Sequence, residues 1–275
     1  MSTQHDRRPG APFTERTPRV AAARALTRRA GREKAGRFLA EGAQAVREAL
    51  AHGAVHEVFT TEAAAARNAD LLHDAAARGV PVSTATDKAV AGLSETVTPQ
   101  GVVAVCDLLD KPLATALAGS PRLVAVLVGV ADPGNAGTVT RVADAAGAGA
   151  VLFAGDTVDP HNGKCVRAST GSVFHLPLAR TRDVREALAA CRAAGLRLVA
   201  ADGYASTDLD QAIDAGALDA PTAWVFGSEA HGLPDDLLSA VDDVVKVPLH
   251  GRAESLNLAT AAAVCLYASA RAHRR

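Results

Sequence analysis

The sequence predicts an α/β fold in which a small N-terminal unit precedes a larger unit built on a parallel sheet. The chain has 275 residues, 48% of them apolar, which is enough to fill one large or two smaller domains. In its C-terminal half, short apolar runs without polar alternation are separated by helical patterns, as in a sheet covered on both faces. Residues 110–121, with two prolines and a Gly-Ser pair, predict a linker between the halves.

The N-terminal half consists of a basic stretch, residues 1–19, and an alternating segment, residues 20–109. The first predicts a flexible leader and the second a compact α/β unit. The spacing of apolar residues predicts helices at about 20–32 and 36–53, a strand at 55–61, a helix at 63–79, and strands at 81–87 and 101–108.

The C-terminal half, residues 122–275, alternates more regularly. Its apolar runs predict strands at 123–129, 150–155, 175–179, 196–202, 222–227 and 244–249, and helices at 135–147, 164–174, 184–195, 209–214, 234–241 and 255–272. Ligands of a parallel sheet bind beyond the carboxyl ends of its strands. The candidate site residues are therefore those that directly follow the strands.

Charge is distributed unevenly along a chain whose net charge is −1. From Arg7 to Arg37 there are ten Arg or Lys residues against Glu15 and Glu33. Such a stretch neutralises nucleic-acid phosphates and releases their counterions. A solvated arginine-rich helix explains the same pattern, so charge alone leaves nucleic-acid binding open.

Cysteine spacing and hydropathy exclude several classes of protein. The four cysteines form no C-x-x-C pair and the nine histidines no H-E-x-x-H motif, so we expect buried free thiols and no bound metal. No uncharged apolar run reaches about 18 residues, and the N-terminus lacks the apolar core of a secretory signal. We therefore expect a soluble, cytoplasmic protein without a membrane partner.

Polar residues and glycines follow three of the predicted strands. In the first of these loops, Asn135 stands between Gly134 and Gly137 at the start of a helix that carries Arg141. An arginine fork in this place suits a phosphate or a ribose hydroxyl. The alternative is that Asn135 caps the helix and Arg141 is an ordinary surface residue.

The other two loops combine acidic, hydroxyl and amide groups. Gly227 and Gly232 flank Glu229, which predicts a close backbone approach, although the helix dipole also favours an acid in a first turn. Ser255 and Asn257 stand at the head of the final helix, where Ser255 as N-cap is the simpler interpretation.

These loops lack the glycine patterns of other α/β enzymes. None has G-x-G-x-x-G after its strand, which disfavours dinucleotide binding, and the absence of G-x-x-x-x-G-K-[ST] excludes P-loop chemistry. Ser228 is not in a nucleophile elbow, because Phe226 and Ala230 stand where that motif needs glycine.

In this order and spacing, the three loops resemble the motifs of the SpoU (TrmH-like) branch of the SPOUT RNA methyltransferases. Asn135, Gly137 and Arg141 match N-x-G-x-x-x-R, Gly227, Glu229 and Gly232 match G-x-E-x-x-G, and Ser255, Leu256 and Asn257 match S-L-N before a helix. The N-terminal unit is similar to the small ribosomal-protein-like RNA-binding domain that precedes many of these catalytic domains.

The resemblance implies a C-terminal trefoil knot, a homodimer, and S-adenosylmethionine bound in the knot. It places the cofactor contacts at Ala201, Asp202, Gly203, Gly227, Val247, Leu249 and Leu256, with Val225 and Leu249 as walls of the adenine site. The final helix would supply the dimer surface, although burial within one subunit explains its apolar face equally well.

The implied reaction is methylation of a ribose 2′-hydroxyl in structured RNA. The resemblance assigns activation of the hydroxyl to Arg141, with Asn135, Glu229, Ser255 and Asn257 positioning Arg141, the loops and the nucleotide. Because a guanidinium stays protonated at neutral pH, we expect Arg141 to bind the adjacent phosphate and polarise the hydroxyl, with the proton leaving through phosphate or water.

Bases in loops and unpaired segments are the accessible ones, which predicts structured rRNA or tRNA as substrate. The separate N-terminal domain favours rRNA, and methylation of large-subunit rRNA in antibiotic resistance fits the same chemistry. Three alternatives remain: a tRNA 2′-O-methyltransferase, a non-catalytic RNA-binding or ribosome-assembly protein with the same fold, and an α/β enzyme acting on a nucleotide-sugar or dinucleotide.

Overall fold

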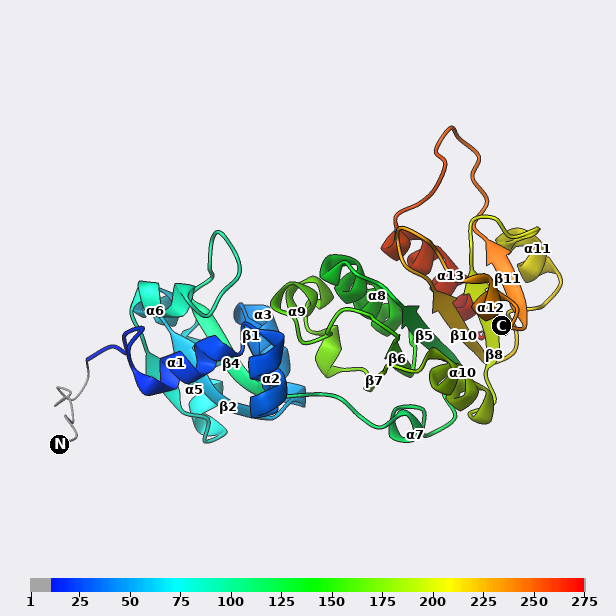
Figure 1. Ribbon diagram of the computed structural model, residues 1–275. Helices are drawn as coiled ribbons and strands as arrows, with labels where there is room; N and C mark the ends of the chain where they lie inside the picture. The colour runs from blue at the N-terminus through cyan, green and yellow to red at the C-terminus, as the bar shows by residue number, and fades with distance from the viewer. Residues whose placement is uncertain (1–10, 275) are drawn as a thin grey trace. The chain divides into compact units, whose positions relative to one another are not determined.

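The structure, a computed structural model, describes residues 11–274 and divides the chain into two compact units that meet between Leu108 and Leu109 (Figure 1). Residues 1–10 of the predicted leader, including Arg7 and Arg8, lie outside the described residues. The first unit contains α1 (Pro18–Ala25), α2 (Arg29–Ala35), β1 (Arg37–Glu41), α3 (Ala43–His52), β2 (Val55–Thr60), α4 (Glu62–Arg67), α5 (Ala69–Ala77), β3 (Val82–Thr84), α6 (Asp87–Ala91) and β4 (Val102–Asp107).

The first unit is built on a four-stranded sheet in the order β1-β4-β2-β3. β4 runs antiparallel to both of its neighbours, and β2 and β3 are parallel. Phe59, Val103 and Val105 of this sheet form a core cluster with apolar residues of α1 and α6. The α/β unit predicted from the alternating pattern is therefore present.

The continuous helical pattern predicted over residues 36–53 is wrong in its first part. Residues Arg37–Glu41 form β1, whose Phe38 pairs with Cys106 of β4, and the helix begins only at Ala43. Gly42 separates the two elements at φ +96°, which glycine adopts without strain. Pairing with a distant strand outweighs the local helical spacing here.

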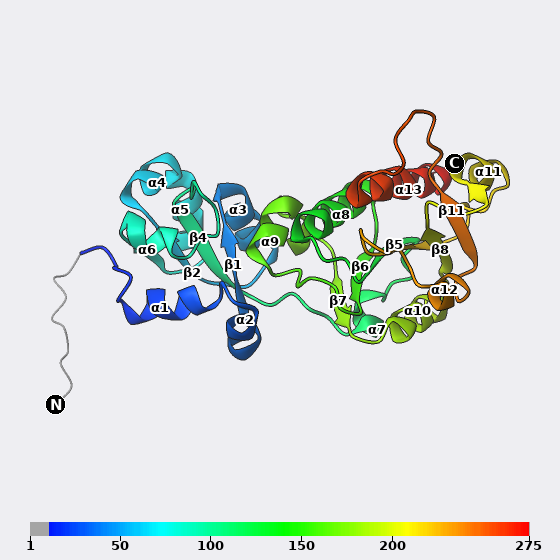
Figure 2. The ribbon, with the colours of Figure 1, turned by 45° about the horizontal axis from the view of Figure 1, so that its top comes forward.

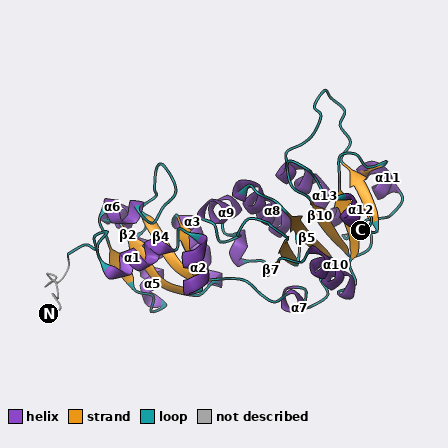
Figure 3. Cartoon of the chain, viewed as in Figure 1, coloured by secondary structure: helices purple, strands orange, loops and turns teal. Residues whose placement is uncertain are grey.

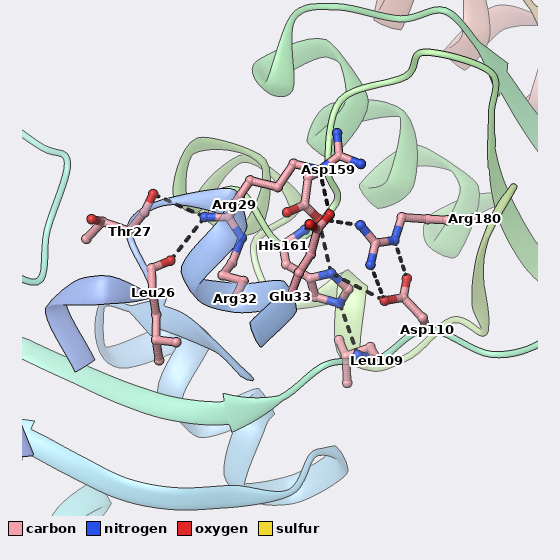
Figure 4. A network of polar contacts seen from close by, with 10 residues as sticks. All are labelled: Leu26, Thr27, Arg29, Arg32, Glu33, Leu109, Asp110, Asp159, His161 and Arg180. Atoms are coloured by element: carbon pink, nitrogen blue, oxygen red, sulfur yellow. Dashed lines mark hydrogen bonds and ion pairs between the residues drawn. The ribbon is translucent and has the colours of Figure 1, made fainter. Parts of the chain in front are cut away.

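The single helix predicted over residues 20–32 is divided into α1 and α2. At the break, the Arg32 guanidinium folds back and donates to the carbonyls of Leu26 (3.0 Å) and Thr27 (3.1 Å), as Figure 4 shows. A Cβ at Gly31 would lie 2.0 Å from the Ala25 carbonyl oxygen, so only glycine permits this turn. Arg32 is 3% exposed and is therefore structural rather than available to phosphates.

The prediction of a flexible leader is wrong for residues 11–19. The Phe13 backbone pairs with Ala85, receiving a hydrogen bond from Thr86 N and donating to Thr84 O, both at 2.8 Å. The Phe13 ring is buried 6.3 Å from the Phe59 ring. Burial of one aromatic ring thus orders a segment whose composition alone indicates a tail.

The second unit is a parallel seven-stranded sheet in the order β7-β6-β5-β10-β8-β11-β9. Its elements are α7 (Leu113–Ala116), β5 (Leu123–Val128), α8 (Pro133–Ala146), β6 (Ala150–Ala154), α9 (Gly163–Ser169), a 3₁₀ turn (Ser172–Phe174), β7 (Leu178–Thr181), α10 (Val184–Ala193), β8 (Arg197–Ala201), β9 (Thr207–Asp208), α11 (Leu209–Asp214), β10 (Thr222–Phe226), α12 (Asp235–Leu238), β11 (Asp243–Lys246) and α13 (Leu258–Ala272).

Helices cover both faces of this sheet, with α8, α9 and α13 on one side and α7, α10 and α12 on the other (Figure 2). Every residue of β5 is buried, as the predicted uniformly apolar strand requires. α13 packs along α8 and against β10, where the buried Trp224 Nε1 donates to Ser269 Oγ at 2.9 Å. Among the strands of this sheet, only the two-residue β9 at the edge was not predicted.

The chain crosses the centre of the sheet more than once. β8 lies between β10 and β11, so the chain passes from β8 to the edge strand β9, returns to the middle for β10, and goes back to β11. The segment after β11 then returns across the sheet so that α13 reaches α8 and β5. This path is consistent with the predicted trefoil knot.

The predicted linker, residues 110–121, is largely ordered against the second unit. It contains α7, and Leu117 is buried in the core cluster formed with α10. Lys111 N donates to Leu178 O at 2.8 Å, which places the segment beside β7. The apolar residues between its prolines explain why this segment packs on the second unit instead of forming an extended linker.

A polar network holds the start of this segment (Figure 4). Arg180 forms a two-pronged ion pair with Asp110, at 2.7 and 2.6 Å, and contacts Asp159 at 3.4 Å. The buried His161 accepts a hydrogen bond from Leu109 N through Nε2 at 3.0 Å, so its Nδ1 carries the proton that faces Asp159. The network anchors the first residues of the second unit to the loop before α9.

All four cysteines are free and buried, as predicted. Burial raises the pKa of Cys191 and of Cys265 to about 12, and raises the pKa of Cys106 and Cys165 further. These thiols are therefore inert core groups at neutral pH. Within residues 11–274, no helix is both long and apolar enough to cross a membrane.

Candidate active site

The predicted loops meet at one edge of the second unit's sheet. β5, β10, β8 and β11 are neighbours in the sheet and run parallel, so their carboxyl ends lie side by side. These four strands lead into the loops that carry the candidate residues, and the longest loop joins β11 to α13 (Figure 3). The strand order thus brings together segments that are far apart in the sequence.

The side-chain amide of Asn135 joins the three sequence motifs. Its Nδ2 donates to Glu229 Oε1 at 2.9 Å, and its Oδ1 accepts from Asn257 Nδ2 at 3.0 Å. The helix cap is supplied instead by Asp132, whose Oδ1 accepts from Asn135 N at 2.8 Å. The alternative of Asn135 as a cap is therefore wrong, and its amide is available to link the loops.

Glu229 is held as a carboxylate by this arrangement. Burial raises the pKa of Glu229, but hydrogen bonds from Asn135 and from the backbone N–H groups of Ala131 and Asp132 outweigh burial and leave the pKa below its usual value. The loop that carries it is closed by paired backbone bonds between Ser228 and Gly232, at 3.1 and 2.9 Å. Glu229 is thus a fixed acceptor beside the first turn of α8.

Asn257, and not Ser255, caps the final helix. Asn257 Oδ1 accepts from Ala259 N at 2.9 Å and from Thr260 N at 3.3 Å, while its Nδ2 reaches Asn135. One amide therefore begins α13 and fixes that helix to α8. Ser255 lies exposed in the preceding loop, so the interpretation of Ser255 as the cap is wrong.

Arg141 lies on the same face of α8 as Gly137, one turn later. A Cβ at Gly137 would lie 2.3 Å from the Cys165 carbonyl oxygen, so glycine permits α8 to pack closely on α9. At the far end of α9, Arg141 Nη1 donates to Thr170 Oγ1 at 3.2 Å, and both side chains are exposed. Arg141 therefore has a partner outside its own helix.

Two residues near the site, Asp132 and Lys164, were not predicted from the sequence. Lys164 of α9 forms an ion pair with Asp132 at 2.6 Å. This hydrogen bond from Lys164, together with that from Asn135 N, lowers the pKa of Asp132. The signal for Asp132 was present, because an acid directly before Pro133 is a typical helix start. Lys164 carries no comparable local signal.

The residues expected at the cofactor follow β8 and β10. Ala201 ends β8. The backbone N–H of Asp202 donates to Val245 O at 3.0 Å, and the Asp202 side chain accepts from Tyr204 N through Oδ1 at 2.8 Å. A Cβ at Gly203 would meet no atom within 4 Å, which shows open space beside this loop. A Cβ at Gly227 would lie 2.3 Å from the backbone of Gly232, so the chain there folds back tightly.

The remaining expected contacts follow β11. Val247 is half-buried, whereas Leu249 is 41% and Leu256 37% exposed. Apolar side chains exposed at the strand ends suit an apolar ligand surface. Val225, by contrast, is fully buried in the core cluster with α10 and α12, so its predicted place at the adenine is wrong.

Comparisons with known proteins agree with this geometry. The model of the SpoU rRNA methylase family matches residues 122–267, which is more than half of the chain. The chain belongs to the SpoU rRNA methylase family. A second model, the MRM3-like substrate-binding domain, matches residues 17–104, so a substrate-binding domain precedes the SpoU domain. Both findings confirm the family and the two-part α/β architecture that the sequence predicted.

Individual relatives cover nearly the whole chain. It is 34% identical over 240 residues to the 23S rRNA (guanosine(2553)-2′-O)-methyltransferase RlmP of Bacillus subtilis, covering 86% of this chain and 89% of the relative. The AdoMet-bound rRNA methyltransferase of Sinorhizobium meliloti is 31% identical, with a TM-score of 0.78 and coverage of 93% and 95%. The SpoU methyltransferase AviRb of Streptomyces viridochromogenes, in complex with the cofactor AdoMet, is 30% identical, with a TM-score of 0.78 and coverage of 93% and 98%.

Proposed function

We propose that this SpoU protein is an S-adenosylmethionine-dependent methyltransferase that modifies a ribose 2′-hydroxyl in ribosomal RNA. The observation that carries the proposal is the joining of all three motifs by Asn135, which contacts Glu229 and Asn257 at 2.9 and 3.0 Å. Of the relatives named above, RlmP is a 23S rRNA 2′-O-methyltransferase, the Sinorhizobium meliloti protein is an AdoMet-bound rRNA methyltransferase, and AviRb is a SpoU methyltransferase in complex with AdoMet. These names support the same reaction here. Large-subunit rRNA is the favoured substrate because the named relative RlmP acts on 23S rRNA.

The residues that follow the strands suit S-adenosylmethionine, because they offer both apolar side chains and backbone polar groups. The exposed apolar side chains of Leu249 and Leu256 suit an adenosyl group, and the loop at Ala201–Gly203 offers backbone groups beside open space. Val247 and the bare backbone of Gly227 complete the proposed contact set. When bound, the donor supplies a methyl group on a sulfonium sulfur, and no metal is required for its transfer.

We assign Arg141 to the RNA rather than to base catalysis. Its guanidinium carries five N–H donors in a planar fork and no acceptor, so it suits a phosphate and an adjacent hydroxyl. With one N–H bound to Thr170 Oγ1, the remaining donors serve the nucleotide. Arg141 would then polarise the 2′-hydroxyl, and its proton would leave to phosphate or water.

The first unit would hold the rRNA through the basic side chains of α1 and α2. Arg24, Arg28 and Lys34 are exposed on this pair of helices, in contrast to the buried Arg32. Exposed cations neutralise phosphates without reading a base, so this unit would contribute affinity and position the RNA. Such an enzyme would work in the cytoplasm, where ribosomal RNA is assembled.

We propose that a second copy of the chain packs against the exposed face of α13 to form a homodimer. Val264 and Tyr267 lie three residues apart on one face of this helix and are 40% and 52% exposed. Exposed large side chains on one face of a helix suit an interface between copies of the chain. We expect light scattering to show a dimer for the purified protein, and Val264→Glu to give monomers.

Ribose-methylation mapping tests the proposed reaction. Unmodified rRNA and tRNA transcripts are incubated with the full chain and radiolabelled S-adenosylmethionine, with Arg141→Ala as the matched control. We expect one new 2′-O-methyl site in 23S rRNA that the control does not produce. Donor binding without transfer to any RNA would indicate a binding or assembly role, and transfer to tRNA alone would overturn the rRNA assignment.

A further inference from the structure

Thr170 adopts a backbone conformation that threonine rarely takes. It ends α9 at φ 52° and ψ 37°, in the left-handed region. Helices commonly end in this conformation, but with glycine or asparagine, because a β-branched side chain crowds its own backbone there. A threonine in this place is therefore strained, and residues kept in strained conformations cluster at functional sites.

The surrounding structure holds Thr170 in this conformation from both sides. Before it, the buried Ser169 donates from Oγ to Val166 O at 2.7 Å, and Thr170 N donates to Arg167 O at 3.1 Å. After it, Gly171 has φ +99° and begins the turn in which Val173 is buried. The strain is thus imposed by packed neighbours on an exposed residue.

The Thr170 hydroxyl points at Arg141. Its Oγ1 accepts from Arg141 Nη1 at 3.2 Å, and the two residues come from helices that Gly137 allows to pack closely. A glycine at position 170 would relieve the strain but would offer the guanidinium no acceptor. The hydroxyl therefore gives threonine a polar contact with Arg141 that an unstrained glycine could not provide.

We propose that Thr170 is a positioning residue for methyl transfer, whose hydroxyl fixes the Arg141 guanidinium for the RNA. The proposal rests on the proposed function, in which Arg141 contacts the phosphate and the 2′-hydroxyl. One guanidinium N–H is bound to Thr170 Oγ1, which limits rotation of the planar fork and leaves its other donors for the nucleotide. Orienting a catalytic group in this way lowers the entropic part of the barrier.

Three variants separate the hydroxyl from the strain. Thr170→Val keeps the β-branched shape and removes the hydroxyl, Thr170→Ser keeps the hydroxyl, and Thr170→Gly removes both hydroxyl and strain. We expect Thr170→Val to lower the single-turnover transfer rate at saturating RNA and donor about tenfold, and Thr170→Ser to stay within about twofold of the wild type. Thr170→Gly should raise Tm by roughly 2 °C while losing rate as Thr170→Val does.

Opposite changes in Tm and rate distinguish positioning from a structural role, in which stability and activity fall together. A wild-type rate in Thr170→Val would overturn the proposal. If the wild type methylates no RNA, the proposed function fails first. The pairing is then decided by the ¹H–¹⁵N guanidinium signals of Arg141, which should show restricted rotation in the wild type and Thr170→Ser but not in Thr170→Val.

Discussion

The side-chain amide of Asn257 donates to the side-chain carbonyl of Asn135 at 3.0 Å, across 122 residues of sequence. Asn135 in turn donates to Glu229, so one amide pair fixes the head of α13 and the loop after β10 to the first turn of α8. Each of the two amides both donates through its N–H and accepts through its carbonyl. A side chain that can only donate or only accept a hydrogen bond therefore cannot replace either of them.

Asn135→Ala should reduce methyl transfer at least tenfold and lower the free energy of unfolding by about 1–2 kcal/mol, because it removes two hydrogen bonds, one of them to a carboxylate. Thr138→Ala is the matched control, since Thr138 is exposed on the same helix and its hydroxyl bonds only to Gly134 O. In a double-mutant cycle with Asn257→Ala, the two effects should be less than additive. Strictly additive effects would contradict a direct bond between the two amides.

Glu229 should make the stability of the protein depend on pH in the acid range. Its pKa in the folded state lies below the ordinary 4.5, so its contribution is complete above pH 4.5 and is lost as pH falls through the folded pKa. The stability advantage of the wild type over Glu229→Gln, measured by urea unfolding, should therefore be largest at neutral pH and shrink below pH 4.5. An advantage that stays constant into the acid range would show that the carboxylate is not preferentially bound.

Gly137→Ala should destabilise the second unit by roughly 1–3 kcal/mol, because overpacking forces two helices apart. The added Cβ would lie 2.3 Å from the Cys165 carbonyl oxygen, a backbone atom that cannot rotate away. Gly251→Ala, where a Cβ would meet no atom within 4 Å, should leave Tm unchanged. Equal melting temperatures for the two variants in thermal unfolding would argue against the close packing of α8 on α9.

Ser269→Ala should lower the free energy of unfolding by about 1–3 kcal/mol, because it leaves the buried Trp224 N–H without its acceptor. The bond, at 2.9 Å, ties α13 to the central strand β10. Ser239→Ala removes an exposed hydroxyl that bonds to Asp235 O and should cost far less in the same urea titration. A loss in Ser269→Ala no greater than in this control would contradict the assigned bond.

The sequence predicted the candidate site better than it predicted the N-terminal elements. Asn135, Glu229 and Asn257 were recognisable because they follow apolar strands at fixed spacing, which is a local property. Phe38 was assigned to a helix because its apolar neighbours have helical spacing, and only pairing with β4 makes that segment a strand. Thr170 was not recognised, since a left-handed backbone at a non-glycine residue leaves no mark in the sequence.

The sequence alone determined the order of the second unit's elements apart from α7 and β9, the parallel sheet of that unit and the family, because apolar periodicity and motif spacing are local. Tertiary structure decided which side chains meet. Asn135 reaches Glu229 and Asn257, and Arg141 reaches Thr170, because β5, β10, β8 and β11 are adjacent and α8 packs on α9. Strand order and helix packing are set by contacts between distant residues, which no local pattern encodes.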